Sequence, residues 1–76
     1  SMVEWLSGAM FDRGARTSDL KQALNLANTT FYDVLNSLSN RRIIQKDGRY
    51  DPWMLTEKGK ELARRHGFIK VLEIRS

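Results

Sequence analysis

The sequence predicts a small α+β domain over residues 3–76, with three helices, a β-hairpin, a fourth helix and a short C-terminal strand. Three observations support this architecture. Apolar residues recur at helical spacing on both sides of a short turn between Ser18 and Asn40. Asp47-Gly48 is a typical two-residue hairpin turn. Thr56 then stands where a helix cap would follow the hairpin.

The first two helices are predicted from periodicity and capping residues. The first is expected over residues 3–12, where apolar residues return every three or four positions before Gly14. Ser18 is expected to cap the second helix, with the acidic Asp19 in its first turn. Asn25 ends that helix, because asparagine tolerates the left-handed conformation that a tight interhelical turn needs.

The third helix is expected over residues 28–40. Its apolar residues fall on one face at positions i, i+3, i+4 and i+7, namely Phe31, Val34, Leu35 and Leu38. The opposite face and its flanks are rich in short hydrogen-bonding side chains and poor in charge, whereas an ordinary solvent face tends to carry more Lys and Glu. These polar positions are Thr29, Thr30, Tyr32, Asp33, Asn36, Ser37 and Asn40. A contact role for this face is one interpretation, and a plain solvated surface is the other.

The hairpin is expected to run from Ile43 to Leu55. Its return strand contains Pro52, which cannot donate to a ladder, so this strand is predicted to lie at an edge or to be bulged. Trp53 is expected to pack against the domain rather than to stack on a ligand.

The C-terminal part is predicted as a helix followed by a strand. The helix is expected over residues 57–66, with Gly67 as its stop. Residues 68–74 are rich in Ile, Val and Phe and are therefore predicted to form a strand. That strand has two possible partners, the domain itself or a second copy of the chain, so a homodimer through residues 68–74 is one hypothesis.

Composition narrows the classes of protein to which the chain can belong. Seventy-six residues make one small domain, and Ser1-Met2 is interpreted as a cloning scar. The absence of cysteine and the single histidine, His66, exclude a disulfide framework and a zinc site of several Cys or His ligands. No apolar run approaches the roughly 20 residues that span a bilayer. We therefore expect an intracellular, cytoplasmic protein with no membrane contact, metal or cofactor.

Charge is distributed unevenly along the chain, whose net charge is +4. Residues 1–40 carry three basic and four acidic residues, whereas residues 41–76 carry ten basic and five acidic residues. A basic half suits a polyanionic partner such as nucleic acid, although a solvated surface has the same composition.

Five short motifs follow one another in an informative order. They are Ser18-Asp19-Leu20 at the start of a helix, Leu24-Asn25-Leu26 at a turn, Thr30 to Leu35 at the start of the next helix, Leu38 to Ile44 leading into the hairpin, and Leu55-Thr56-x-x-Gly59-x-x-Leu62 after it. Together they resemble the winged helix-turn-helix domains of the MarR and related bacterial and archaeal regulators, over residues 17–62.

The chain departs from that family at four positions. Ala27 stands where a capping Ser is usual, so the cap is expected to shift to Asn28. Lys21 stands where a small residue often packs between helices, and Arg42 replaces the usual Gly before the hairpin. Asp33 stands where a basic residue is frequent, which removes one expected phosphate contact. The fold tolerates all four changes, but Asp33 weakens the expectation of tight DNA binding.

The resemblance implies duplex DNA binding, in transcription regulation. The recognition helix, residues 28–40, would read base edges in the major groove, and the wing, residues 43–55, would contact the backbone or the minor groove. The candidate contact residues are Asn28, Thr29, Thr30, Tyr32, Asp33, Asn36, Ser37, Arg41, Arg42, Lys46, Arg49 and Tyr50.

A second hypothesis is a protein-interaction or assembly module of a replication or transcription complex with the same fold. Asp33, the mild net charge and the β-prone segment 68–74 favour it. An enzyme is not expected, because the sequence shows no nucleophile paired with a base, no paired carboxylates in a perturbing context and no phosphate-cradling glycine loop. Arg64-Arg65 is expected to be a solvated basic patch rather than a second DNA site.

Overall fold

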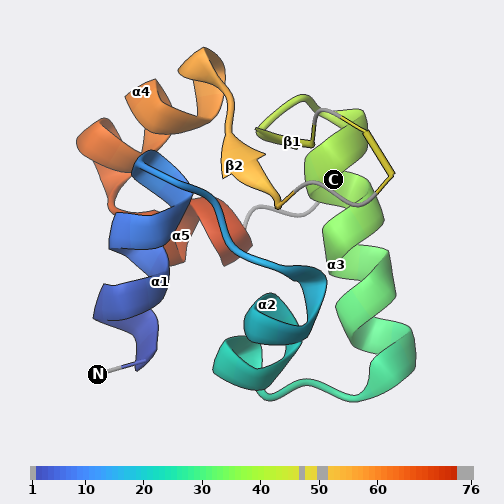
Figure 1. The fold of residues 1–76 in the computed structure, drawn as a ribbon. Helices are drawn as coiled ribbons and strands as arrows, with labels where there is room; N and C mark the ends of the chain where they lie inside the picture. The colour runs from blue at the N-terminus through green and yellow to red at the C-terminus, as the bar shows by residue number, and fades with distance from the viewer. Residues whose placement is uncertain (1, 47, 50–51, 74–76) are drawn as a thin grey trace.

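The computed structural model describes residues 2–46, 48–49 and 52–73. Within these ranges the chain is α+β, with five helices and one two-stranded antiparallel hairpin (Figure 1). The elements are α1 (Met2–Phe11), α2 (Thr17–Leu24), α3 (Asn28–Asn40), β1 (Ile44–Gln45), β2 (Met54–Leu55), α4 (Glu57–His66) and α5 (Phe68–Glu73). In Figure 1, α1 and α4 lie on one side of the molecule, α3 lies on the other, and the hairpin lies between α4 and α3.

The start of α2 differs from the prediction. The helix begins at Thr17, so the prediction that Ser18 caps it is wrong. Arg16 occupies the cap position, and its backbone N–H donates to the Asp19 carboxylate over 3.2 Å. A carboxylate in the first turn thus satisfies one of the amide groups that a helix leaves without a partner at its start. The end of α2 is as predicted, because Asn25 adopts the left-handed conformation at φ 52 and ψ 45.

α3 has the predicted bounds but begins without a side-chain cap. Ala27 occupies the cap position in an extended conformation and offers no side-chain acceptor, so the prediction that the cap shifts to Asn28 is wrong. The predicted apolar face is confirmed: Phe31, Leu35 and Leu38 are buried and Val34 packs against them. The helix is therefore held by burial of this face rather than by its N-terminus.

The hairpin ladder is shorter than predicted. Ile44 lies opposite Leu55, and Gln45 lies opposite Met54. In the described part of the return strand, Pro52 and Trp53 lie outside this ladder, which fits the predicted irregularity around a proline. The predicted tip residue Asp47 lies outside the described residues, as do Tyr50 and Asp51 of the predicted return strand.

Trp53 ties the hairpin to the segment between α1 and α2. It pairs with Ala15 through two backbone hydrogen bonds of 2.8 Å each, one in either direction. Its indole N–H donates to the Thr17 hydroxyl over 3.0 Å. An isolated antiparallel bridge therefore joins the hairpin to Ala15, and Trp53 packs against the domain as predicted, with only 8% of its surface exposed.

α4 matches the prediction at both ends. The Thr56 hydroxyl accepts the backbone N–H of Gly59 over 3.0 Å, which caps the helix. Gly67 ends it at φ 90, a conformation that few residues other than glycine adopt.

The prediction of a strand over residues 68–74 is wrong, because Phe68–Glu73 forms the short helix α5. Phe68, Val71 and Leu72 are buried while Ile69 and Lys70 are exposed, which is the i, i+3, i+4 pattern of an amphipathic helix. Burial of this face against the core outweighs the β propensity of its residues. Strand pairing through this segment is thereby removed as a route to a dimer.

One apolar core joins all these elements. Leu6 and Met10 of α1, Leu20 of α2 and Phe31 of α3 are almost fully buried together with Val71 of α5. Among the described residues, no polar or charged side chain is buried. The polar side chains of the described residues are therefore exposed or partly exposed.

Candidate functional site

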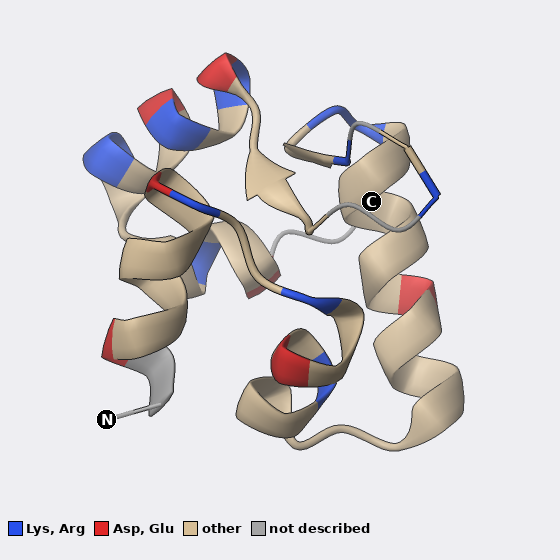
Figure 2. Ribbon diagram, in the orientation of Figure 1, with Lys and Arg blue, Asp and Glu red and all other residues tan. Residues whose placement is uncertain are grey.

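The exposed side of α3 is rich in hydrogen-bonding groups and poor in charge. Within α3, which is described throughout, no lysine or arginine is present and Asp33 is the only charged residue (Figure 2). Tyr32 is 47% exposed, and its ring meets that of Phe31 edge-on with centroids 5.0 Å apart. We define the α3 outer face as its exposed residues, Asn28, Thr29, Tyr32, Asp33, Asn36 and Asn40.

Two arginines, Arg41 and Arg42, directly follow the C-terminal end of α3. Arg41 closes the helix and Arg42 turns the chain into β1 with φ 61, in the left-handed region. Two residues near the start of α4 hold this turn. The Thr56 hydroxyl donates to the Arg42 carbonyl, and the Lys58 ammonium donates to the Arg41 carbonyl over 3.1 Å. The end of α3 and the start of α4 are thus joined by hydrogen bonds.

The hairpin adds two exposed cations, Lys46 and Arg49. The Lys46 ammonium lies 4.9 Å from the centroid of the Trp53 ring and also contacts the Arg49 carbonyl at 3.4 Å. A cation over an aromatic face keeps its charge while part of its stem is packed. Lys46 is therefore held in one direction by the domain rather than extended freely into solvent.

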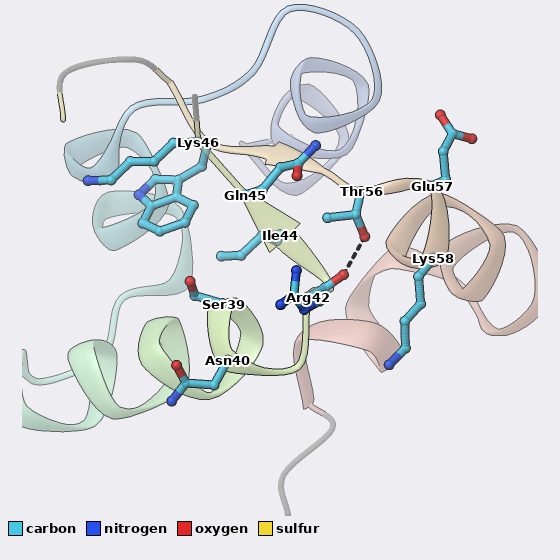
Figure 3. Close-up of a pocket in the computed structure, with 10 residues that line it drawn as sticks. Ser39, Asn40, Arg42, Ile44, Gln45, Lys46, Thr56, Glu57 and Lys58 are labelled. Atoms are coloured by element: carbon cyan, nitrogen blue, oxygen red, sulfur yellow. Dashed lines mark hydrogen bonds between the residues drawn. The ribbon is translucent and has the colours of Figure 1, made fainter. Parts of the chain in front are cut away.

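A groove of about 680 Å³ lies between the C-terminal end of α3, the hairpin and the first turn of α4 (Figure 3). Its lining comes from two segments of the chain, residues 39–46 and residues 53–58. We call it the α3–α4 groove, and its uncharged and basic polar residues include Ser39, Asn40, Arg42, Gln45, Lys46 and Lys58. Ile44 and Trp53 supply its apolar part.

The structure brings together only some of the residues that the sequence predicted as contacts. Arg42 and Lys46 line the α3–α4 groove. Asn28 and Thr29 lie at the opposite end of α3, about 18 Å away along a helix that rises 1.5 Å per residue. Thr30, Ser37 and Arg41 are half-buried, whereas the remaining described candidates are exposed. Tyr50 lies outside the described residues.

Sequence reasoning missed Lys58, which lines the groove from α4. The residue was visible as a cation in the first turn of a capped helix, but nothing in the sequence placed that turn beside the end of α3. The hydrogen bond from Thr56 to the Arg42 carbonyl creates this neighbourhood. No pattern of spacing within one element predicts such a contact.

The other cations of α4 are offset by acidic neighbours on the same helix. Glu61 lies 3.9 Å from Arg64 and 3.2 Å from Arg65, and both arginines are exposed. Surface pairs of this kind contribute little to stability, but they lower the local positive potential. Both arginines are exposed and paired with an acidic neighbour, and their assignment to a solvated patch rather than a second DNA site stays a prediction.

The chain matches no family model, no curated protein and no solved structure. In the part of the chain that the structure describes, no helix is long and apolar enough to cross a membrane. The same residues contain no group of three or more His, Cys, Asp or Glu side chains placed to hold a metal ion.

Proposed function

We propose that this domain is a winged helix-turn-helix module that binds duplex DNA in transcription regulation, with α3 as the recognition helix and the hairpin as the wing. The observation that carries the proposal is the α3 outer face. Apart from Asp33, it presents uncharged hydrogen-bonding side chains beside exposed cations of the adjoining turn and hairpin. This combination fits a ligand that carries hydrogen-bonding edges between two lines of negative charge.

The arrangement of elements supports the winged-helix part of the proposal. Three helices precede an antiparallel hairpin, and the Ala15–Trp53 bridge attaches the hairpin to the segment between α1 and α2. The hairpin is thereby fixed to the core at its base, and its first strand contacts α3. A fixed hairpin beside an exposed helix can contact a duplex at two places at once.

The chemistry of α3 suits base edges. The amides of Asn28 and Asn36 can each pair with the N6 and N7 groups of adenine, and the methyl group of Thr29 can contact that of thymine. Asp33 can accept a hydrogen bond from N4 of cytosine, but it repels phosphates. The outer face therefore offers base recognition with little electrostatic attraction.

The attraction must come from the cations outside the helix. Lys46 and Arg49 lie on the hairpin, and Arg42 lies at its base. The logarithm of the binding constant falls linearly with the logarithm of the salt concentration. Each phosphate that the protein neutralises adds about 0.9 to the steepness of this slope. Three such contacts predict a slope of roughly 3 and hence a weak, salt-sensitive affinity for generic duplex.

The proposal is tested by fluorescence anisotropy with a labelled random-sequence duplex between low and moderate salt. Lys46→Gln should weaken binding on the order of tenfold at 50 mM salt and lower the salt slope by about 1. Lys70→Gln on α5 is the matched control, because it removes one exposed charge away from the hairpin. Absence of binding by the parent at the lowest salt would refute DNA binding.

A second candidate, a protein-interaction module, is favoured by one specific observation. Trp5 on α1 is 42% exposed, beside Gly8, around whose Cβ position no atom lies within 4 Å. An exposed tryptophan next to open space is typical of contact surfaces between proteins. Size-exclusion chromatography with a Trp5→Ser variant tests whether this surface mediates self-association, whereas the duplex titration distinguishes the two candidates.

A further inference from the structure

The α3–α4 groove concentrates positive charge more than any part of α3 does. Arg42, Lys46 and Lys58 line it, and these residues come from the turn, the hairpin and α4 respectively. In Figure 3 the Arg42 side chain lies between Ile44 and Lys58, and Lys46 lies on the other side of Ile44. The three cations therefore form a row across the groove rather than a single cluster.

Among the described residues that line the groove, the carboxylate of Glu57 does not cancel this charge. Glu57 and Lys58 project in opposite directions from the start of α4 in Figure 3. The Glu57 carboxylate lies 3.7 Å from the Lys60 ammonium, on the outer surface of the same helix. The Lys58 ammonium uses one of its three donors on the Arg41 carbonyl and keeps two for another acceptor.

Arg42 occupies a backbone position that favours glycine. Two described residues other than glycine have a positive φ, Asn25 at 52 and Arg42 at 61. Asparagine tolerates this region because its short side chain can bond to the local backbone, whereas arginine gains nothing there. An arginine at such a position lowers the stability of the fold relative to glycine. A strained position with an exposed functional group is the pattern found at binding sites.

We propose that the α3–α4 groove is a binding site for a nucleic-acid phosphodiester backbone, in which Arg42 makes the central phosphate contact and Lys46 and Lys58 lie on either side. The inference rests on the proposed function and adds α4 to the interface. It also separates two tasks. The α3 outer face meets base edges, and the groove at the end of that helix supplies the attraction to phosphate.

The surface next to the groove favours phosphodiester over an acidic peptide. A guanidinium presents paired N–H groups whose geometry matches two oxygens of a phosphate or a carboxylate, and the flanking ammonium groups act as point charges toward either, so the cations alone select an anion. Asn40 and Gln45 add neutral donors along the same lining. Asn40 also belongs to the α3 outer face, so one continuous ligand can occupy both surfaces.

The test compares Arg42→Gly with Lys58→Gln and with the control Lys70→Gln. Each variant is titrated with the labelled random-sequence duplex at several salt concentrations, and its thermal unfolding is recorded. We expect Arg42→Gly to raise the Tm by roughly 4–8 °C and yet to weaken binding on the order of tenfold at 50 mM salt. Lys58→Gln should weaken binding similarly, and each variant should lower the salt slope by about 1.

The outcomes separate the two proposals. If the parent binds no duplex at low salt, the proposed function fails and this inference fails with it. If the parent binds and both Arg42→Gly and Lys58→Gln bind like the parent, only the groove assignment is overturned. Binding of a poly-glutamate peptide without binding of duplex would overturn the assignment to phosphodiester. Higher stability together with weaker binding in Arg42→Gly excludes unfolding as the cause and supports the inference.

Discussion

The substitution Gly59→Ala in α4 tests how closely this helix approaches the hairpin. A Cβ added at Gly59 would overlap the carbonyl oxygen of Ile43 and lie 3.0 Å from Cδ2 of Leu55. The obstacle is backbone, which cannot rotate away as the end of a flexible side chain does. The Ile43 carbonyl is also held by the Thr56 N–H, which donates to it over 3.0 Å.

The expected cost of Gly59→Ala follows from these contacts. In an exposed helix the change would stabilise by about 1 kcal/mol, because alanine is the better helix former. Here the overlap must be relieved by moving α4, and overpacking of this kind costs about 1–3 kcal/mol. Weakening one hydrogen bond to the Ile43 carbonyl adds about 1 kcal/mol. The free energy of unfolding should therefore fall by about 1–3 kcal/mol.

Urea unfolding followed by circular dichroism measures this change. With a slope of about 1 kcal/mol per molar for so small a domain, the midpoint should fall by about 1–3 M. Gly8→Ala is the matched control, because Gly8 lies in α1 and an added Cβ would meet no atom within 4 Å beyond its chain neighbours and the backbone of its own helix. That variant should gain up to about 1 kcal/mol. A Gly59→Ala domain as stable as the parent would refute the close approach.

Two further predictions concern stability. Leu35→Ala should lower the free energy of unfolding by about 2–5 kcal/mol, because Leu35 lies in the core and is only 8% exposed. A variant that melts like the parent would contradict the assigned buried face of α3. Thr56→Val should cost about 1–2 kcal/mol in urea unfolding, because the hydroxyl both caps α4 and bonds to the turn before β1. Thr56→Ser keeps the hydroxyl and should retain most of that stability. Equal losses of stability in the two variants would contradict a stabilising role of the hydroxyl.

Local signals in the sequence were sufficient for most of the helical elements. The spacing of Phe31, Leu35 and Leu38 defined α3 and its buried face, and all three are buried. Thr56 and Gly67 marked the ends of α4 because capping chemistry is local. Asn25 marked a left-handed turn for the same reason.

The errors arose where long-range packing decides the structure. Residues 68–73 have β-prone side chains, yet Phe68, Val71 and Leu72 bury a helical face against the core. The cap of α2 is the exception, because the contact that moved it is local: Asp19 accepts the Arg16 amide three residues away. Lys58 entered the α3–α4 groove only because Thr56 and Lys58 bond to the turn at the end of α3. A single sequence carries no signal for such contacts.

The most direct test of the account is an amide-resolved NMR titration of the whole chain with a random-sequence duplex at low salt. Binding through the α3 outer face and the α3–α4 groove predicts shifts concentrated at residues 28–37, at Arg42 and Lys46, and at Lys58. Shifts confined to Arg64-Arg65 and α5, or the absence of any shift, would contradict duplex binding through α3 and the hairpin.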